Sequence, residues 1–557
     1  MSHLISRKII FFHIALIIIM GFAAYANSLT GKFIWDDEYL VANNFYITSF
    51  KNLPMIFTKD IGLGAFTQYG SYRPFQMLTY MIDYSVWGLN VTGYHLTNTL
   101  LHILVALAVY WLITILFNKR TISFFTAILY VIHPVHTEAV SYISGRADSL
   151  AALFMLLSII FYITQLRANT VFISILMILS YIVAILSREN ALILPILLVL
   201  YHYVFKSKVK IKPFLTIVSI VFGYIVLRTL VLKSISFPGL NFNILFLRIP
   251  GLFVAIINYL RLLFLPFNLH MDYGNAIFHL TDLRAISGLA ITSLLILYIF
   301  QKRNNNRLVS FSIAWFFINL LPVTNIYPAQ ISYMAEHWLY LPCMGFALAV
   351  ASVLYGILNT TKKYRIFTYI FIGIYFSFYF YLTVRQNEYW QVPIRFYEKT
   401  AEYSPNKATA YTLLCSGYID IGNNEKAVQA CAKAIQINPH ISRVYYNLGN
   451  AYSNIGKNEE AIKAYQKEII NDPGFLEAYN NLAAMYTTIG KIDEALALWN
   501  KIVRLNPDFV IAYFNLSKFY FSQGHYDLAV THCNEVIKRG YKVDPKFLKL
   551  LEPYQNK

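Results

Sequence analysis

The stretch IIFFHIALIIIMGFAAY, from Ile9 to Tyr25, decides the class of fold to which this chain belongs. It follows Arg7 and Lys8 and contains no Asp, Glu, Lys or Arg. Roughly 18 apolar residues, at about 1.5 Å each along a helix, nearly cross a hydrocarbon core of about 30 Å. Such a run suits either a signal peptide or a first membrane helix. Because many more apolar segments follow, we expect an uncleaved membrane anchor.

The composition of the whole chain agrees with a membrane protein. Its 557 residues are 57% hydrophobic and only 13% charged, and the mean hydropathy is +0.49, which is too apolar for a soluble protein of this size. The net charge is +18, but no basic patch interleaves with aromatic residues on a soluble part, so we expect no nucleic-acid partner. The basic residues lie mostly between apolar segments, where they indicate topology and contact with anionic lipid headgroups.

Apolar runs predict eleven membrane spans. They lie near residues 8–27, 94–117, 121–133, 149–166, 170–187, 191–205, 213–233, 284–301, 308–322, 338–358 and 366–385. The basic loops between them, such as the one around Lys206, fall on one side of the membrane if the N-terminus is cytoplasmic. An odd number of spans then places everything after about residue 386 outside, together with the loop 28–93.

One further apolar segment, 250–266, is long enough to span, yet counting it would move a basic loop to the outer side. We therefore interpret it as an interfacial or re-entrant helix on the outer side. The predicted fold is all-α, with a multi-span membrane helix bundle over residues 1–386 and a separate domain over 387–557.

The domain 387–557 consists of repeats with a period of 34 residues. Four sets of identical residues recur at this spacing: Pro405, Pro439, Pro473 and Pro507; Gly422, Gly456, Gly490 and Gly524; Ala427, Ala461, Ala495 and Ala529; Tyr411, Tyr445, Tyr479 and Tyr513. This is the tetratricopeptide signature, in which the small Ala lets two helices approach and the Gly permits the turn between them. We expect an α-solenoid with repeats near 408–441, 442–475, 476–509 and 510–543.

The cysteines predict neither a metal site nor a disulfide framework. Cys415 and Cys431 occupy repeat positions at which the next copy carries Gly449 and Tyr465. We therefore expect both cysteines to be packing residues and not a redox pair.

The stretch FIWDDEYL, Phe33 to Leu40, places Asp36, Asp37 and Glu38 just beyond the first apolar segment. Ionisable groups close to a membrane are costly to desolvate and mark a pathway, a binding site or a catalytic group. The alternative is that these carboxylates are ordinary helix N-caps or interfacial residues.

Four other polar clusters lie where a predicted span meets the outer surface. They are Ser71–Pro74 with Arg73, the segment 133–148, Ser187–Asn190 with Arg188 and Glu189, and Ala335–Pro342 with Glu336 and His337; the segment 133–148 carries His133, His136, Glu138, Arg146 and Asp148. The cytoplasmic loops are short and simply basic, so any chemistry is expected outside.

These clusters suit the binding of a phosphate better than that of a metal. Pro134 interrupts the helix that would align His133, His136 and Glu138, and no fourth ligand is evident, so a divalent metal is not expected. The arginines either snorkel to lipid headgroups and pair with Asp148 and Glu189 or hold a phosphate, which guanidinium binds bidentately.

Taken together, the motifs around Asp36, Arg73, His133 to Asp148, Arg188 and Glu336, followed by tetratricopeptide repeats, resemble those of the transmembrane and tetratricopeptide-repeat-containing O-mannosyltransferases and their bacterial relatives. The resemblance covers nearly the whole chain. It implies a GT-C glycosyltransferase, a multi-span enzyme that uses a polyprenyl-phosphate-linked sugar and an acidic motif in its first outer loop. His337 stands where the family pattern would place an arginine.

The resemblance assigns roles to particular residues. Asp36 and Asp37 match the acidic motif, with Asp36 as the base and Asp37 orienting the acceptor or tuning its neighbour. Arg73, Arg146 and Arg188 would hold the donor phosphate. Supporting roles are expected for Glu38, His133, His136, Glu138, Asp148, Glu189, Glu336 and His337.

The expected function is therefore the inverting transfer of a sugar, as in protein O-mannosylation, from a polyprenyl phosphate to a hydroxyl of a protein or glycan on the outer side. The repeats would recruit a protein acceptor or partner. In a bacterium the chain would lie in the cytoplasmic membrane with periplasmic repeats, and in a eukaryote in the endoplasmic-reticulum membrane with lumenal repeats. The alternative is a non-enzymatic membrane scaffold or lipid-linked-glycan transporter. A transferase requires Asp36, Arg146 and Arg188 to converge on one outer cavity, whereas a scaffold does not.

Overall fold

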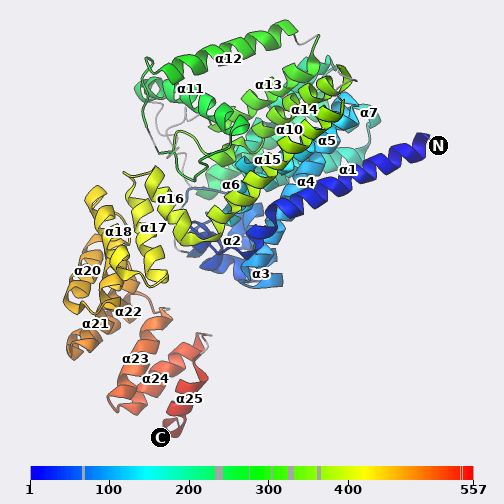
Figure 1. Cartoon of the computed structure of the whole chain (residues 1–557). Helices are drawn as coiled ribbons and strands as arrows, with labels where there is room; N and C mark the ends of the chain where they lie inside the picture. The colour runs from blue at the N-terminus through cyan, green and yellow to red at the C-terminus, as the bar shows by residue number, and fades with distance from the viewer. Residues whose placement is uncertain are drawn as a thin grey trace. The chain divides into compact units, whose positions relative to one another are not determined.

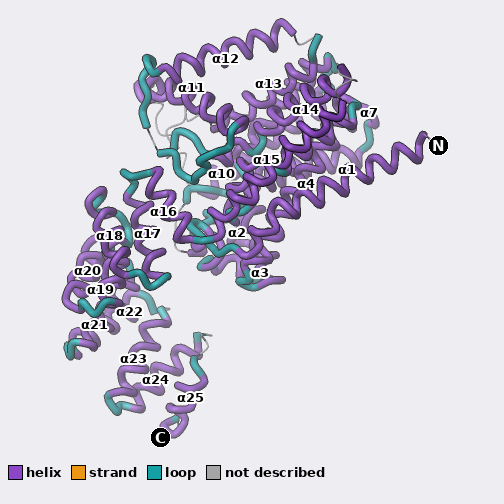
Figure 2. Tube along the Cα trace, in the orientation of Figure 1, coloured by secondary structure: helices purple, strands orange, loops and turns teal. Residues whose placement is uncertain are grey.

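The computed structural model describes residues 2–65, 69–232, 242–274, 276–302, 305–323, 332–360, 365–507, 509–539, 541 and 543–555 (Figure 1). Over these residues the chain is helical, with no strand, as Figure 2 shows. The predicted all-α class is confirmed. The chain divides into two compact units, Met1–Phe396 and Tyr397–Lys557.

The first unit contains the apolar helices. They are α1 (Ser2–Tyr25), α4 (Val91–Phe117), α5 (Arg120–Val131), α7 (Arg146–Ala168), α8 (Val171–Ser187), α9 (Leu194–Phe205), α10 (Ile211–Leu232), α11 (Phe242–Phe264), α12 (Leu283–Lys302), α13 (Arg307–Leu320), α14 (Pro342–Thr360) and α15 (Arg365–Gln391). Among the described residues, eight helical stretches are long and apolar enough to cross a membrane, and four shorter apolar ones accompany them.

These twelve apolar stretches include all eleven predicted spans. The additional one is Phe246–Phe264 in α11, which we expected to lie at the interface. Its length and composition are those of a span, so neither property separates it from the others. The topology stays a prediction.

The core of this unit is formed by α4, α5, α7, α8 and α14, which pack against one another. Tyr130, Leu156 and Leu348 are each fully buried there, while the side chains on the outer faces of α10 and α12 are exposed and apolar. A helix that exposes apolar side chains outward and packs a second face inward suits a bundle surrounded by lipid.

The loop 28–93, which the topology predicts to be the first outer loop, is a small folded segment. It contains α2 (Leu53–Thr58), α3 (Pro74–Trp87) and several short helical turns. Its own apolar cluster includes Leu40, Ile47 and Met77. The loop is therefore held by side-chain packing as well as by its ends.

The second unit contains the repeats, and Figure 1 shows them as successive helical hairpins. After α16 (Pro393–Tyr403), the pairs are α17 (Ala408–Asp420) with α18 (Asn424–Ile437), α19 (Val444–Asn454) with α20 (Asn458–Asn471), α21 (Leu476–Thr488) with α22 (Ile492–Leu505), and α23 (Val510–Ser522) with α24 (Tyr526–Lys538). The four turn glycines have φ of 76°, 76°, 79° and 78°, a conformation that a Cβ atom disfavours. Helix α25 (Pro545–Leu551) follows the last repeat.

The expectation for Cys415 and Cys431 was wrong, because a disulfide joins them. Cys415 lies on α17 and Cys431 on α18, and the same two positions face each other in the next repeat. There, a Cβ atom on Gly449 would lie 2.5 Å from the ring of Tyr465. In the first repeat, the contact between the two helices is made by the bonded sulfur atoms of Cys415 and Cys431. In the second repeat, the ring of Tyr465 packs over Gly449 at the same place.

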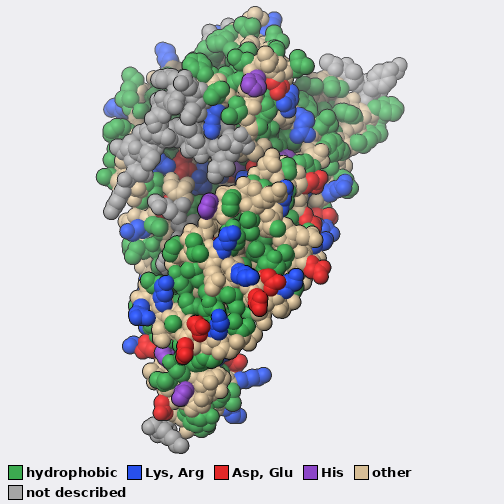
Figure 3. Space-filling model, turned by 90° about the vertical axis from the view of Figure 1, so that its left-hand side faces the viewer, with side chains coloured by type: hydrophobic (Ala, Val, Ile, Leu, Met, Phe, Trp, Pro, Cys, Tyr) green, Lys and Arg blue, Asp and Glu red, His purple; other side chains and the backbone are tan. Residues whose placement is uncertain are grey.

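The repeats have a polar surface of mixed charge. In the lower half of Figure 3, where the repeats lie, acidic and basic side chains are interspersed with apolar ones. This is the surface of a domain in water.

Candidate active site

A pocket of about 180 Å³ opens beside the first outer loop. Most of the residues that line it are polar, and they come from the loop 28–93 and from the segments around Glu138, Arg188, Met271 and His337. The lining residues are Asp36, Leu40, Ile61, Tyr69, Ser71, Arg73, Glu138, Tyr142, Ser144, Gly145, Asp148, Arg188, Met271 and His337. A smaller cavity of about 20 Å³ shares Asp148, Arg188 and His337 with it and adds apolar residues such as Met155 and Leu341.

The pocket lies where short apolar helices end. Helix α5 ends at Val131, before His133 and Pro134, and a 3₁₀ turn, Pro134–His136, follows it. The residue before a proline is disfavoured in a helix, which explains this end. Irregular backbone at membrane depth is tolerated only where protein buries it or it lines a cavity.

Gly145 allows the 3₁₀ turn Ile143–Gly145 to approach the backbone at Glu138. A Cβ atom at Gly145 would lie 2.3 Å from the carbonyl oxygen of Glu138. Only glycine allows this approach, and the approach places Ser144 against the first outer loop.

Asp37 is completely buried and is engaged by three donors. The backbone N–H and the hydroxyl of Ser144 donate to its Oδ1 at 2.8 and 2.5 Å, and the backbone N–H of Ile34 donates to its Oδ2 at 3.2 Å. Burial raises the pKa of Asp37 to about 7, although these donors oppose the shift. Asp37 is not part of the pocket lining, so its contacts fix the loop to the turn at Ser144.

Asp36 faces the pocket. The hydroxyl of Tyr69 donates to its Oδ1 at 2.9 Å, and its own backbone N–H donates to the hydroxyl of Tyr142 at 3.1 Å. Burial raises the pKa of Asp36 above the ordinary value, while Tyr69, Tyr142 and the charge of Arg73 oppose the shift. The preceding residue, Trp35, has φ of 52°, so a bulky side chain is held in the left-handed region next to the carboxylate.

Ion pairs engage the other carboxylates around the pocket. Glu189 accepts from Nε of Arg73 at 3.0 Å, and Asp148 pairs with Arg188. Asp36 has no cation within 4 Å among the residues that the structure describes. It is therefore the pocket carboxylate most available to a substrate hydroxyl.

Glu138 and His337 form a further pair. Nδ1 of His337 lies 2.6 Å from Oε1 of Glu138, and the backbone N–H of His337 donates to Oε2 at 2.8 Å. Burial raises the pKa of Glu138 and lowers that of His337 to about 3. Burial thus opposes charge on both groups.

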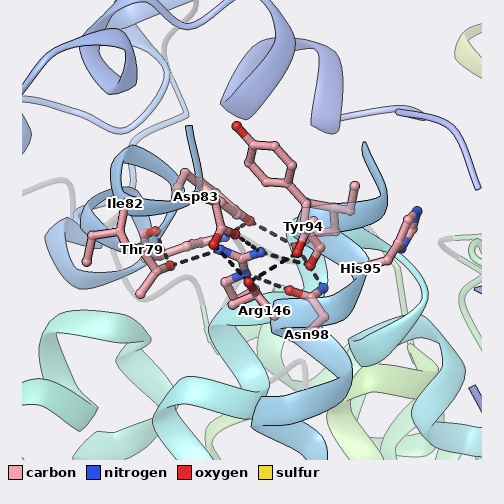
Figure 4. Close-up of polar contacts among 12 residues, drawn as sticks. Thr79, Ile82, Asp83, Tyr94, His95, Asn98 and Arg146 are labelled. Atoms are coloured by element: carbon pink, nitrogen blue, oxygen red, sulfur yellow. Dashed lines mark hydrogen bonds and ion pairs between the residues drawn. The ribbon is translucent and has the colours of Figure 1, made fainter. Parts of the chain in front are cut away.

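Arg146 does not reach the pocket, and its predicted role in binding the donor phosphate needs correction. Its guanidinium is buried and lies 2.6 Å from Asp83 and 2.6 Å from Oδ1 of Asn98. It also donates to Thr79 and to the carbonyl of Tyr94 at 3.3 and 3.1 Å (Figure 4). All three nitrogens are engaged within the protein, so Arg146 connects α7 to α3 and α4.

Five predicted supporting residues also lie outside the pocket lining, and one of them, Glu189, pairs with Arg73. Glu38 begins a short turn, Glu38–Ala42, and Glu336 accepts from Tyr273 at 2.7 Å. Nε2 of His133 lies 3.0 Å from the carbonyl oxygen of Leu263. His136 is fully buried among aromatic rings, and its ring nitrogens have no hydrogen-bond partner in the described part of the chain.

The pocket also contains residues that sequence reasoning did not assign. Tyr69 and Tyr142 contact Asp36, and Tyr142 is oriented by stacking on Trp390 at 5.6 Å between ring centroids. Tyr142 lies two residues before Ser144, close to a cluster that the sequence already indicated. Tyr69 had no such signal, because a tyrosine in an aromatic-rich loop is common. Over the described residues, no three His, Cys, Asp or Glu side chains come together as a metal site.

The class of protein follows from the fold and the pocket: a multi-pass membrane protein with a polar pocket and a tetratricopeptide-repeat solenoid. The tetratricopeptide-repeat family matches residues 408–441, 442–473 and 486–542. Among solved structures, the crystal structure of MamA matches 26% of this chain and 85% of its own, with 28% identity and a TM-score of 0.24.

Curated relatives of this chain are named protein O-mannosyl-transferases. F38B6.6 of Caenorhabditis elegans is 26% identical over 443 residues, covering 76% of this chain and 62% of the relative. TMTC4 of Homo sapiens is 24% identical over 479 residues, covering 74% and 64%. TMTC1 of Homo sapiens is 39% identical over 143 residues, covering 25% and 16%. The chain thus spans less than two thirds of each relative's length, and its resemblance to this family is confirmed.

Proposed function

We propose that this protein is a membrane glycosyltransferase that moves a sugar from a polyprenyl-phosphate donor to a hydroxyl group on the outer side of the membrane. Mannose is the sugar that the names of its relatives contain. The observation that supports the proposal is that Asp36, Arg73 and Arg188 line one pocket. Arg146, which the transferase was expected to place there as well, lies outside it on Asp83 and Asn98, and Arg73 stands in its place.

The reaction needs a base and a place for a departing phosphate. Asp36 takes the proton of the acceptor hydroxyl as its oxygen attacks the anomeric carbon from the face opposite the phosphate. The bond between that carbon and the phosphate oxygen breaks, and the product has inverted configuration. A lipid phosphate leaves as an anion and needs no proton, unlike the alkoxide in a glycosidase reaction.

Arg73 and Arg188 would hold the phosphate. Arg73 uses Nε for Glu189, and Arg188 uses Nη1 for Asp148. A guanidinium has five N–H donors, so each arginine retains donors for phosphate oxygens. Such donors lower the barrier because they already point to the site where charge develops.

Asp37 acts differently from the role that the motif suggested. Its oxygens already accept three hydrogen bonds inside the protein, so it positions the loop that carries Asp36 and does not orient the acceptor itself.

The disulfide supports an outer location for the repeats. Disulfides persist in the periplasm, in the endoplasmic-reticulum lumen and outside cells, and are rare in the cytosol. The link between Cys415 and Cys431 therefore agrees with the topology that the basic loops predict. In this location the repeats would present a protein acceptor or partner to the membrane unit.

The decisive experiment follows label from a synthetic polyprenyl-phosphate mannose into protein or glycan with the purified full chain. Asp36→Asn keeps the shape of the side chain and removes its basicity, so transfer should fall by roughly 10²–10⁴-fold with donor binding little changed. Arg188→Gln should weaken donor binding as well as the rate.

Normal transfer by Asp36→Asn would exclude Asp36 as the base. Binding of the donor by the wild type without any transfer to protein or glycan would favour the transporter or scaffold.

A further inference from the structure

Two polar side chains on α10, Tyr224 and Arg228, have hydrogen-bonding capacity that the described protein does not use. They lie four residues apart and therefore on one face of the helix. Tyr224 is only 4% exposed, and its hydroxyl has no hydrogen-bond partner among the residues that the structure describes. Nε of Arg228 is buried and also lacks a partner among the described residues. Because buried polar groups are nearly always hydrogen-bonded, both groups have capacity for a ligand, and their place beside the pocket distinguishes them from other unpartnered buried groups such as Tyr181.

The pair lies beside the rim of the pocket. The hydroxyl of Tyr224 is within electrostatic range of Arg73, Glu189 and Arg228. Nη2 of Arg228 makes a long contact of 3.4 Å with the carbonyl oxygen of Gly70, which lies in the first outer loop. Arg73, which lines the pocket, is three residues further along this loop.

The charge balance of the pocket makes Arg228 important. Arg73 and Arg188 each pair with a carboxylate, so neither brings uncompensated positive charge to a bound anion. Arg228 has no carboxylate within 4 Å over the described part of the chain. Compared with Arg73 and Arg188, Arg228 is therefore the arginine whose charge is available to a phosphate.

The other faces of α10 lie toward lipid. Phe222, Val226 and Leu230 are exposed and apolar, and α10 has the length and composition of a membrane span. Arg228 is half-buried between this apolar surface and the pocket. An arginine near the end of a span reaches the depth of lipid phosphates.

We propose that Tyr224 and Arg228 bind the phosphate of a polyprenyl-phosphate lipid as it enters the pocket sideways from the bilayer. The guanidinium contacts the phosphate oxygens and the Tyr224 hydroxyl donates to one of them. Arg73 then receives the phosphate on the pocket side. The inference deepens the proposed function, on which it rests for the identity of the lipid.

The test measures the binding of a sugar-free polyprenyl phosphate to the full chain in nanodiscs by native mass spectrometry. Arg228→Gln should weaken binding by about tenfold or more, because it removes a charge-assisted contact. Tyr224→Phe should weaken binding several-fold, and Arg228→Lys should lie between Arg228→Gln and the wild type. In the transfer reaction, Arg228→Gln should raise KM for the donor more than it lowers kcat.

Two matched controls are available in the chain. Tyr181→Phe also removes a buried hydroxyl without a hydrogen-bond partner, from α8, and Arg167→Gln removes an exposed charge at the end of α7. Both should bind the lipid as the wild type does. Equal binding by the wild type, Arg228→Gln and Tyr224→Phe would overturn the inference.

Two further ligands distinguish the source of the phosphate. Inorganic phosphate at millimolar concentration should displace the lipid poorly, and polyprenol without phosphate should bind equally to the wild type and to Arg228→Gln. Efficient displacement by inorganic phosphate would show a site for the free anion and refute lateral lipid entry.

This result is separable from that of the proposed function. If Asp36→Asn transferred sugar normally while Arg228→Gln lost the lipid, the catalytic role of Asp36 would fail and the entry site would stand. If Arg228→Gln and Tyr224→Phe bound the lipid normally while Asp36→Asn lost transfer, the entry site would fail and the catalytic role of Asp36 would stand.

Discussion

Asp36 and Asp37 are neighbours in the chain, but their surroundings separate their roles. Asp37 accepts three hydrogen bonds inside the protein, whereas Asp36 faces the pocket and accepts one from Tyr69. Trp35 precedes the two carboxylates, has φ of 52° and packs edge-on against Phe396. Its backbone conformation fixes the direction in which the chain enters the Asp36–Asp37 pair. Adjacent carboxylates thus divide into one that holds the loop and one that is free to react.

The pKa of Asp36 predicts the pH dependence of transfer. A base must be ionised to act, so the rate falls as the pH drops through its pKa. Burial raises this pKa, and the acid limb of the kcat profile should therefore lie above the value for an exposed aspartate, about 3.9. Tyr69→Phe removes a hydrogen bond that opposes the shift and should move the limb to still higher pH.

The measurement is a profile of kcat against pH for the wild type and Tyr69→Phe. An acid limb at the same pH in both proteins would contradict the assignment of Asp36 as the base.

Arg146 shows how a buried arginine can be structural. Arg146→Gln leaves Asp83 buried without its partner, so the free energy of unfolding should fall by about 3–5 kcal/mol. Thermal unfolding of the detergent-purified protein measures this loss, and the exposed Arg167→Gln is the control. Asp83→Asn should destabilise similarly, and the double variant should lose less than the sum of the two.

The opposite result is informative. If Arg146→Gln were as stable as the wild type and only donor binding were lost, Arg146 would be a phosphate ligand as the sequence suggested.

At the scale of helices, the pocket depends on where the short apolar helices stop. Helices α5 and α8 end at Val131 and Ser187, and the irregular turns after them carry Glu138, Arg188 and Glu189 to the pocket region. Full-length spans would bury these positions in helix. The early ends of these helices, the first of them just before Pro134, therefore create the space in which charged side chains meet.

In the repeats, the disulfide locks the first hairpin. Cys415 and Cys431 are 16 residues apart, and closing a loop of about 15 residues contributes about 3 kcal/mol in the chain-entropy account. Reduction should lower the free energy of unfolding of the fragment 397–557 by about that amount, as measured by urea denaturation with and without reductant.

The double variant Cys415→Ser/Cys431→Ser is the control, because reductant should not change its stability. Equal stability of the oxidised and reduced wild type would show that the link contributes nothing.

At the scale of the whole molecule, the prediction concerns the side of the membrane on which each part lies. The native cysteines give little background, because Cys343 and Cys533 are buried and the other two are bonded. In bacterial cells with a permeabilised outer membrane, Lys491→Cys in the repeats should react with an impermeant thiol reagent. Lys208→Cys, in the basic loop after α9, should not react until the inner membrane is opened. The reverse pattern would refute the outer location of the repeats.

The sequence by itself determined the features that depend on local regularity. Apolar runs long enough for lipid identify most membrane helices, and a period of 34 residues identifies the repeats, because each repeat must present the same small and large residues to its neighbours. The five polar clusters were also visible, since charge near the membrane stands out against an apolar background. The resemblance of these clusters to a known family added the proposed chemistry.

Only the tertiary structure decided which of these polar residues meet. Arg146 and Arg188 look alike in sequence, yet Arg146 packs against Asp83 and Arg188 lines the pocket. Likewise, Arg228 lies in an apolar run and gave no signal, and Cys415 and Cys431 became partners only when two helices aligned. The physical reason is that a side chain's direction depends on its rotation about the helix axis and on the neighbour packed there. The rotation of a helix and the identity of its neighbour are set by contacts between segments far apart in the chain, and local sequence patterns do not contain this information.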